Sequence, residues 1–430
     1  MKKSIVILCT LDTKYDEVQF LKEVILDGGH MVLIVDISLG KESGLPCDIT
    51  PQEIAEAAGS DINKVRDLAS KERGLASTIM TKGSILKARE LMEKGNLHGI
   101  IGLGGCSNTA MATTVMKSLP FGIPKLMVSS AASMPAYAAG YIGTSDITMM
   151  HSVVDFTGTN DLIRDVLTRA GGAICGMVEN AGTHPGKKGK VRKRPLIAIS
   201  EFNFCDTAAR LAIKYLDEEG FDSIPMHAQG TGDMAMEELI EQGFFDGVID
   251  LVTAGVSEDI FGGNRAAGPT RLEAAGKIGI PQVLAPSGFE MISCGPMSRK
   301  DKGDPLWISR SLSSRKLFKQ DDYRVQARTT QDELCEIALT VAQKLNKAKG
   351  PVKFLIPLRG WSTLTTEGAP FWEPETDKVF SEMLKKHLKP EIEVIEMDVE
   401  LNSPEFVRAA VDALIRMMDN CQNGKFDSTE

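Results

Sequence analysis

The chain has 430 residues, of which 43% are hydrophobic and 25% are charged, a balance typical of a globular protein with two or three domains. The formal net charge of −9 argues against broad binding to nucleic acid or to an anionic membrane surface, because both favour a basic protein. No uninterrupted apolar stretch approaches the ~18 residues needed to cross a bilayer, so we expect no membrane partner.

The N-terminus carries two lysines and then a short apolar run, Ile5–Cys9. This run is soon interrupted by Asp12 and lacks a small-residue cleavage site, so we interpret it as a buried strand rather than as a signal peptide. The eight cysteines form no C-x-x-C pair and no zinc-type spacing with histidine. These features predict reduced thiols, no structural metal and a cytoplasmic location.

Residues 1–180 alternate apolar runs with helical patterns, and Thr50-Pro51-Gln52-Glu53 is a capping box that starts a helix. Strands separated by helices pair in parallel, and strands this apolar are buried on both faces. The pattern predicts an N-terminal Rossmann-like domain. Its strands are Ile5–Cys9, Met31–Asp36, Gly99–Leu103 and Lys125–Val128, and its helices include Asp16–Asp27, Ser84–Glu93, Asn108–Lys117 and Ile163–Val178.

Residues 181–195 are rich in glycine, proline and basic side chains and offer no apolar face. We interpret them as a solvated basic linker, with a phosphate contact by the basic run as the alternative.

The alternation resumes over residues 196–421 and predicts a second Rossmann-like α/β domain. Residues 295–328 form a long polar segment, either a functional lid or a disordered loop, and residues 422–430 form a disordered tail. The predicted strands are Leu196–Ser200, Ser223–His227, Gly247–Val252, Gln282–Ala285, Val352–Pro357 and Glu391–Met397, and the helices are Thr207–Glu219, Met234–Gln242, Arg271–Lys277, Glu333–Asn346, Thr376–Leu388 and Pro404–Met418. The fold class is therefore α/β, with two mostly parallel sheets flanked by helices.

A glycine-rich turn follows the strand Gly99–Leu103 and leads directly into a helix. Glycines let backbone N–H groups approach a ligand, and a helix N-terminus adds free N–H groups and a positive dipole end. The turn matches neither the Walker motif nor the dinucleotide motif. We predict that it holds a phosphate or carboxylate, with an empty tight turn as the alternative. Its candidate residues are Gly104, Gly105, Cys106, Ser107, Asn108 and Thr109.

Polar residues also follow the first two predicted strands. Ligands of open parallel sheets bind beyond the carboxyl ends of the strands. Thr10 and Thr13 offer hydroxyls there, Asp12 offers a Mg²⁺ ligand, and Lys14 offers a phosphate-binding ammonium. Simple helix capping is the alternative. Asp36, which ends the second strand, is predicted to accept from a ribose hydroxyl.

Further candidate residues lie elsewhere in the two predicted domains. The cluster Gly143, Thr144, Ser145 and Asp146 follows the strand Lys125–Val128 and is either a ligand-binding loop, with Asp146 as a second Mg²⁺ ligand, or a surface loop. If the two domains face each other, His227 and Glu258 are acid–base candidates at a cleft. A satisfied histidine and a capping carboxylate are the alternatives. Lys14 and Asp146 are the other catalytic candidates.

Six motifs together resemble the Tm-1-like ATP-binding family, also called UPF0261, over nearly the whole chain. They are Asp12–Lys14, Gly102–Gly105, Pro124–Ser129, Gly143–Met150, Gly268–Gly276 and Pro357–Gly360. The resemblance implies ATP binding, two Rossmann-like subdomains and a homodimer. The family is also similar to the N-terminal part of a plant virus-resistance protein in which a TIM-barrel domain follows, which implies a separate TIM-barrel partner. Two segments depart from the family pattern, Cys106–Asn108 and Glu201–Phe204.

The main hypothesis is an ATP-binding protein that holds nucleotide and Mg²⁺ in its N-terminal domain, near the interdomain cleft, with Asp12 and Asp146 as metal ligands. One alternative is a metabolic enzyme that acts on a phosphorylated or sugar-acid molecule in that cleft. The other is a non-catalytic scaffold or inhibitory binding protein.

Overall fold

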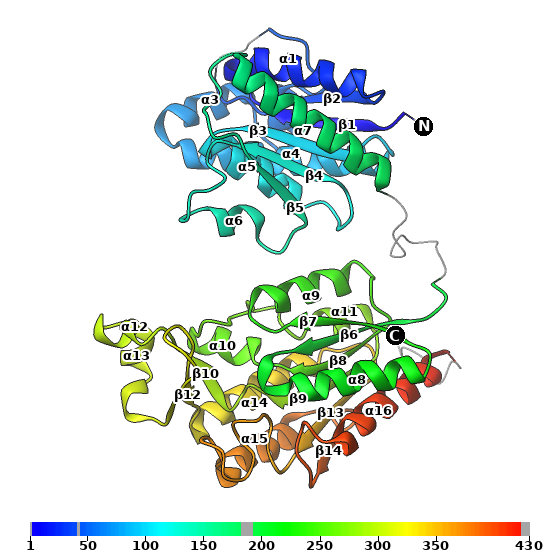
Figure 1. Cartoon of the computed structure of the whole chain (residues 1–430), viewed down its shortest axis with the longest axis vertical. Coiled ribbons are helices and arrows are strands. Elements are labelled where there is room, and N and C mark those ends of the chain that lie inside the picture. Colours follow the sequence, from blue (N-terminus) through cyan, green and yellow to red (C-terminus); the bar gives the residue numbers. More distant parts are fainter. Residues whose placement is uncertain (1, 41–43, 182–191, 423–430) are drawn as a thin grey trace. The chain divides into compact units, whose positions relative to one another are not determined.

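The computed structural model describes residues 2–40, 44–181 and 192–422 (Figure 1). The chain divides into two compact units, Met1–Lys187 and Lys188–Glu430, here called unit 1 and unit 2. Most of the predicted linker, and all but the first residue of the predicted tail, lie outside the described residues. No helix in the described ranges combines the length and apolar character needed to cross a membrane.

Unit 1 is built on a five-stranded parallel sheet in the order β2-β1-β3-β4-β5. Four strands match the prediction to within about a residue, and the fifth was missed. The edge strand β5 is only partly buried and therefore lacks the continuous apolar run that marked the others. The strands are β1 (Ser4–Cys9), β2 (Met31–Asp36), β3 (Gly99–Gly104), β4 (Lys125–Ser129) and β5 (Ile147–His151).

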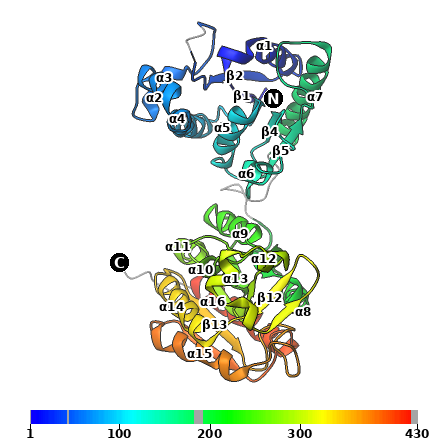
Figure 2. The same ribbon diagram turned by 90° about the vertical axis from the view of Figure 1, so that its left-hand side faces the viewer.

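Helices cover both faces of this sheet (Figure 2). Alternate residues of β1 enter opposite cores: Ile5 and Ile7 pack with α1 and α7, and Val6 and Leu8 pack with the α2–α5 side. The capping box at Thr50 is present, which confirms that prediction. The helices are α1 (Leu11–Asp27), α2 (Pro51–Ala57), α3 (Ile62–Lys71), α4 (Arg73–Glu93), α5 (Cys106–Lys117), α6 (Ala138–Ile142) and α7 (Asp161–Asn180).

Unit 2 contains a six-stranded parallel sheet in the order β14-β13-β9-β8-β6-β7. Two large apolar cores flank it, one with α8 and α16 and the other with α14 and α15. The two-domain α/β prediction is confirmed. The strands are β6 (Leu196–Glu201), β7 (Asp222–His227), β8 (Gly247–Val252), β9 (Gln282–Ser287), β13 (Val352–Pro357) and β14 (Glu393–Met397), and the helices are α8 (Asp206–Glu218), α9 (Thr231–Glu241), α10 (Gly255–Phe261), α11 (Ala274–Ile278), α14 (Gln331–Leu345), α15 (Pro374–His387) and α16 (Pro404–Gln422), with a 3-10 turn at Asn203–Cys205.

The predicted disordered loop at residues 295–328 is wrong, because this segment is folded (yellow in Figure 2). The alternative role of the segment as a functional lid stays a prediction. The strands β10 (Met291–Ser293), β11 (Leu317–Lys319) and β12 (Val325–Arg328) form a small antiparallel sheet. Trp307 is buried and donates its indole N–H to the Cys294 carbonyl at 2.8 Å. The buried apolar residues of this segment occur in short runs such as Leu306-Trp307, between polar and charged residues, so no periodic signal marks them. The short helices are α12 (Ser298–Asp301) and α13 (Pro305–Ser309), with a 3-10 turn at Leu312–Ser314.

Candidate functional site

A pocket of ≈ 280 Å³ opens at the carboxyl edge of the unit 1 sheet. It lies between the turns that follow β1 and β3, where the strand order reverses, and this switch point is where open α/β sheets bind ligands. The sequence-predicted residues that line it are Thr10, Asp12, Thr13, Lys14, Gly104, Gly105, Cys106, Ser107 and Asn108. The structure therefore brings the two principal predicted turns together.

The N-terminus of α5 presents unpaired donors at this pocket. Its N-cap is Gly105, so no capping side chain takes the first amides. The first internal helical bond runs from the Thr109 N–H to the Gly105 carbonyl at 2.9 Å. The backbone N–H groups of Cys106, Ser107 and Asn108 donate no hydrogen bond within the described ranges. Three free donors at the positive end of a helix dipole are an arrangement to which anions commonly bind in proteins.

Gly104 and Asn108 hold this turn in shape. Gly104 has a φ of 149°, and a Cβ there would lie 2.9 Å from the Asn108 Cβ, so only glycine fits. The Asn108 side chain donates to the Leu103 carbonyl. Its Oδ1 is buried and has no partner among the described residues, so the turn contains one acceptor without a donor. Thr109 does not reach the pocket, because its hydroxyl bonds Ser129 beneath the turn at 2.6 Å.

The N-terminus of α1 is satisfied from within the protein. The Leu11 N–H donates to Asp36 Oδ1 at 3.1 Å, and the Asp12 N–H donates to Ser38 Oγ at 3.2 Å. Asp36 also accepts from the Ser38 N–H at 3.0 Å and from its hydroxyl. Asp36 is 2% exposed, and burial raises its pKa. The predicted ribose contact is therefore wrong: this carboxylate fixes the turn after β1.

Two cations line the pocket. Lys14 lies where α1 kinks (φ −133°, ψ 27°), which explains why the sequence predicted the helix only from Asp16, and its ammonium donates to the Phe156 carbonyl. Arg73, the first residue of α4, is exposed and makes no hydrogen bond or ion pair with the described residues. Sequence reasoning missed Arg73, because only the packing of α4 brings it to this edge.

Two carboxylates line the same pocket. Asp12 Oδ2 accepts from the Gly40 N–H at 3.0 Å. Asp155 Oδ1 accepts from Ser130 Oγ at 3.1 Å and from the Phe156 N–H at 3.0 Å. The second oxygen of each carboxylate has no hydrogen-bond partner among the residues that the structure describes. The described part of the chain holds no group of three or more metal-ligating side chains, so a Mg²⁺ ion here would need ligand phosphates as well.

Asp146 lies at the opposite edge of the sheet. It precedes β5, and parallel strands place their first and last residues at opposite edges, separated by roughly 15 Å over five residues. Asp146 accepts from the buried Lys125 ammonium at 2.6 Å and from the Gly122 N–H at 2.8 Å. Desolvation lowers the pKa of Lys125. The predicted metal and catalytic roles of Asp146 at the nucleotide are therefore wrong, and its neighbours Gly143, Thr144 and Ser145 do not line the pocket.

The two acid–base candidates of unit 2 differ in their exposure to solvent. Glu258 in α10 is fully buried and accepts from the Arg265 guanidinium at 2.6 and 2.9 Å. Burial raises its pKa. The predicted acid–base role is contradicted, because this carboxylate has no access to a substrate. His227 ends β7, and its exposed Nδ1 lies 3.0 Å from Glu201 Oε1; its acid–base role stays a prediction.

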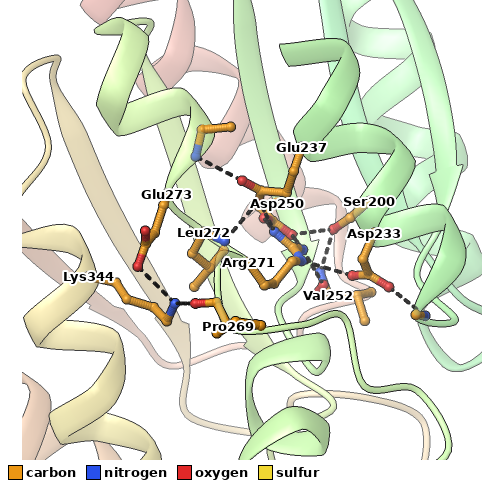
Figure 3. A network of polar contacts seen from close by, with 12 residues as sticks. Ser200, Asp233, Glu237, Asp250, Val252, Pro269, Arg271, Leu272, Glu273 and Lys344 are labelled. Atoms are coloured by element: carbon orange, nitrogen blue, oxygen red, sulfur yellow. Dashed lines mark hydrogen bonds and ion pairs between the residues drawn. The ribbon is translucent and has the colours of Figure 1, made fainter. Parts of the chain in front are cut away.

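The Gly268–Gly276 motif forms a buried charge network in unit 2 (Figure 3). Arg271 is fully buried and contacts Asp250 at 2.6 and 2.7 Å, Asp233 at 2.9 Å and Glu237 at 3.0 Å. Glu237 also accepts from the Ala274 N–H at 2.8 Å, where α11 begins. The sequence predicts a helix that begins at Arg271, but α11 begins three residues later, at Ala274. The buried contacts of Arg271 explain the difference, because they hold this residue in the turn before the helix.

Known proteins match this chain along its length. The model of the Uncharacterised protein family (UPF0261) N-terminal domain matches residues 3–183, and that of its C-terminal domain matches residues 194–418. A UPF0261 protein of Clostridium tetani is 37% identical over 420 residues, covering 97% of this chain and 100% of that protein. A UPF0261 protein of Mesorhizobium japonicum is 32% identical, covering 95% and 97%.

The ToMV resistance protein Tm-1(GCR237) of Solanum lycopersicum is 30% identical over 427 residues, which cover 95% of this chain and 55% of the tomato protein. Among solved structures, the Streptomyces sp. SF2575 glycosyltransferase SsfS6, complexed with thymidine diphosphate, is 12% identical and covers 73% of this chain and 87% of that one. The TM-score of this match is 0.18. By its domain matches and relatives, the chain belongs to the UPF0261 family.

Proposed function

We propose that unit 1 binds ATP as its Mg²⁺ complex, with the phosphates on the N-terminus of α5. The observation that carries this proposal is the set of three unpaired N–H groups, of Cys106, Ser107 and Asn108, at the switch point of the sheet. Backbone donors at a helix N-terminus are the common protein solution for holding a phosphate, and the sequence resemblance to a Tm-1-like ATP-binding family agrees with it.

The charges around the pocket favour a metal-bound polyanion over a free one. Lys14 and Arg73 supply positive charge for the phosphates. Asp12 and Asp155 would repel a bare triphosphate, but they suit Mg²⁺, which takes one or two carboxylates together with substrate phosphates. Binding should therefore depend on Mg²⁺.

Titration calorimetry tests this proposal directly. The folded chain is titrated with ATP, ADP and inorganic tripolyphosphate, each with and without Mg²⁺. We expect saturable binding of ATP and tripolyphosphate that strengthens with Mg²⁺. If the folded chain gives no binding to either ligand under any of these conditions, the proposal is wrong. Light scattering of the same sample tests the proposed homodimer, and co-purification with a separate TIM-barrel protein tests the proposed partner.

Alkylation of Cys106 offers an independent measurement. Cys106 is the exposed thiol of the pocket, and the other seven cysteines are buried or half-buried. Iodoacetamide should modify it first, and ATP with Mg²⁺ at ten times its Kd should slow this reaction about tenfold by mass action. Peptide mass spectrometry reports each cysteine separately, with the half-buried Cys421 of unit 2 as the internal control. Equal rates with and without nucleotide would contradict phosphate binding beside Cys106.

Arg73→Ala tests the electrostatic contribution of the second cation. We expect tripolyphosphate affinity to fall about tenfold at low ionic strength, because the lost charge faces the bound anion, and the deficit should shrink as salt screens it. Lys71→Ala is the matched control: it removes the same charge from the nearby end of α3 and does not line the pocket. Equal losses in the two variants would show that Arg73 acts only through net charge.

A further inference from the structure

A second hollow, of ≈ 450 Å³, runs between α4 and α5 in unit 1. Its walls are the stretch of α4 from Ser77 to Leu86 and three residues of α5, Ala110, Met111 and Thr114. Met111 also lines the anion pocket, so the two hollows meet at this side chain.

Helix geometry makes the two hollows continuous along both walls. Residues four apart lie on the same face of a helix, about 6 Å along its axis. On α4, Arg73 lines the anion pocket and Ser77 lines the groove. On α5, Ser107 lines the pocket and Met111 lines both. A ligand whose anionic end lies at Cys106–Asn108 therefore has the groove as its immediate extension.

The groove is apolar in its chemistry although several threonines line it. The hydroxyls of Thr78, Thr81 and Thr114 donate to carbonyls of their own helices at 2.7–2.9 Å, so their donors are already used. Leu86 remains 43% exposed there. The Ser77 hydroxyl and the Lys82 ammonium have no hydrogen-bond or ion-pair partner in the described part of the chain. Small-molecule sites commonly combine apolar walls with a few free polar groups in this way.

We infer that the α4–α5 groove holds the base of the nucleotide whose phosphates lie on α5. This inference rests on the proposed function and adds the place at which the ring of the nucleotide base is held. The anion pocket alone falls just below the ~300–1,000 Å³ typical of small-molecule sites, and the two hollows together fall well within that range. Ile85 and Leu86 offer apolar contacts to a planar ring in the groove, and the exposed Lys82 ammonium can approach its π-system.

Filling the groove tests the inference. Ala110→Trp and Thr78→Trp each place an indole in the groove, from α5 and from α4 respectively. We expect either variant to weaken ATP about tenfold or more, toward the affinity of tripolyphosphate, and to leave tripolyphosphate within about twofold of wild type. Thermal melts show whether each variant is folded. Because the two substitutions lie on different helices, one variant still tests the inference if the other does not fold.

Leu39→Trp is the matched control, because Leu39 lines the anion pocket on its β2 side and not the groove. If Leu39→Trp alone weakens ATP, the base lies on the β2 side and the inference is wrong. The inference is also wrong if the two groove variants leave the affinity for ATP unchanged. A change in oligomeric mass alone, with unchanged ATP affinity, counts as this outcome. Equal wild-type affinity for ATP and tripolyphosphate overturns the inference while phosphate binding stands. Binding of neither ligand overturns both.

Discussion

Replacing Gly105 with valine is expected to lower the affinity for ATP and for tripolyphosphate at least about 100-fold without unfolding unit 1. Gly105 has extended backbone angles (φ −88°, ψ −164°), which a β-branched residue adopts readily. A Cβ built there meets only Ser130 Oγ, at an ordinary 3.7 Å. The added Cβ therefore displaces no protein neighbour, and we expect the valine side chain to occupy the pocket beside the free N–H groups of α5.

The neighbouring glycine supplies the contrast. Gly104→Val is expected to destabilise unit 1, because its φ of 149° and the 2.9 Å approach to the Asn108 Cβ exclude a side chain. Gly172→Val is the control for the general effect of a glycine-to-valine change on stability. Gly172 is exposed on α7, and a Cβ built there has nothing within 4 Å. Calorimetry and thermal melts on all three variants separate binding from folding. A folded Gly105→Val variant that binds ATP like wild type would refute the phosphate site.

The parts of the site that follow local sequence rules could be predicted. The turns at Thr10–Lys14 and Gly104–Asn108 both follow buried strands, and parallel pairing brings the carboxyl ends of such strands to one edge. The sequence also predicts that Asp36 lies at that edge, which the structure confirms. Whether its carboxylate faces a ligand or the Leu11 N–H depends on the path of the turn after β1. Sequence pattern does not encode that path.

The errors at the site come from elements with weak local signals. Asp146 was assigned to the carboxyl edge because β5 was not recognised, and a strand that begins at Ile147 places Asp146 at the amino edge instead. The same omission hid Asp155, which lies beyond the carboxyl end of β5. Glu258 is an acid–base candidate from its place after β8, but in α10 it is fully buried against Arg265. Each error is one of tertiary packing, which single-chain periodicity does not report.

In unit 2, replacing Arg271 with leucine is expected to lower the free energy of unfolding by about 3–5 kcal/mol, the usual consequence of leaving buried charges without their partner. Arg271 is fully buried and contacts Asp233, Glu237 and Asp250, so the variant strands three carboxylates in the interior. Arg271→Lys keeps the charge but loses the two-pronged contact with Asp250, and it should fall between wild type and Arg271→Leu. Urea denaturation measures both.

The deficit should depend on pH in a defined direction. Burial raises the pKa of Asp233 and of Glu237, and Arg271 opposes that rise. Without Arg271 these native pKa values rise further above those of the unfolded chain. The native state then binds more protons than the unfolded state over a wider range, so stability falls as pH increases through the raised native pKa values. Arg271→Leu should therefore lose more stability, relative to wild type, near pH 8 than near pH 5.

The exposed Arg210, which pairs with Asp206 on the surface of α8, gives the matched control. Arg210→Leu removes the same charge from the same unit, but water solvates its partner once the arginine is gone, so we expect no pH-dependent loss of stability. If Arg271→Leu showed the same deficit at both pH values, the cost would come from lost packing of a large side chain rather than from uncompensated carboxylates. Some other group in unit 2 would then have to stabilise the buried carboxylates of Asp233 and Glu237 in their charged form.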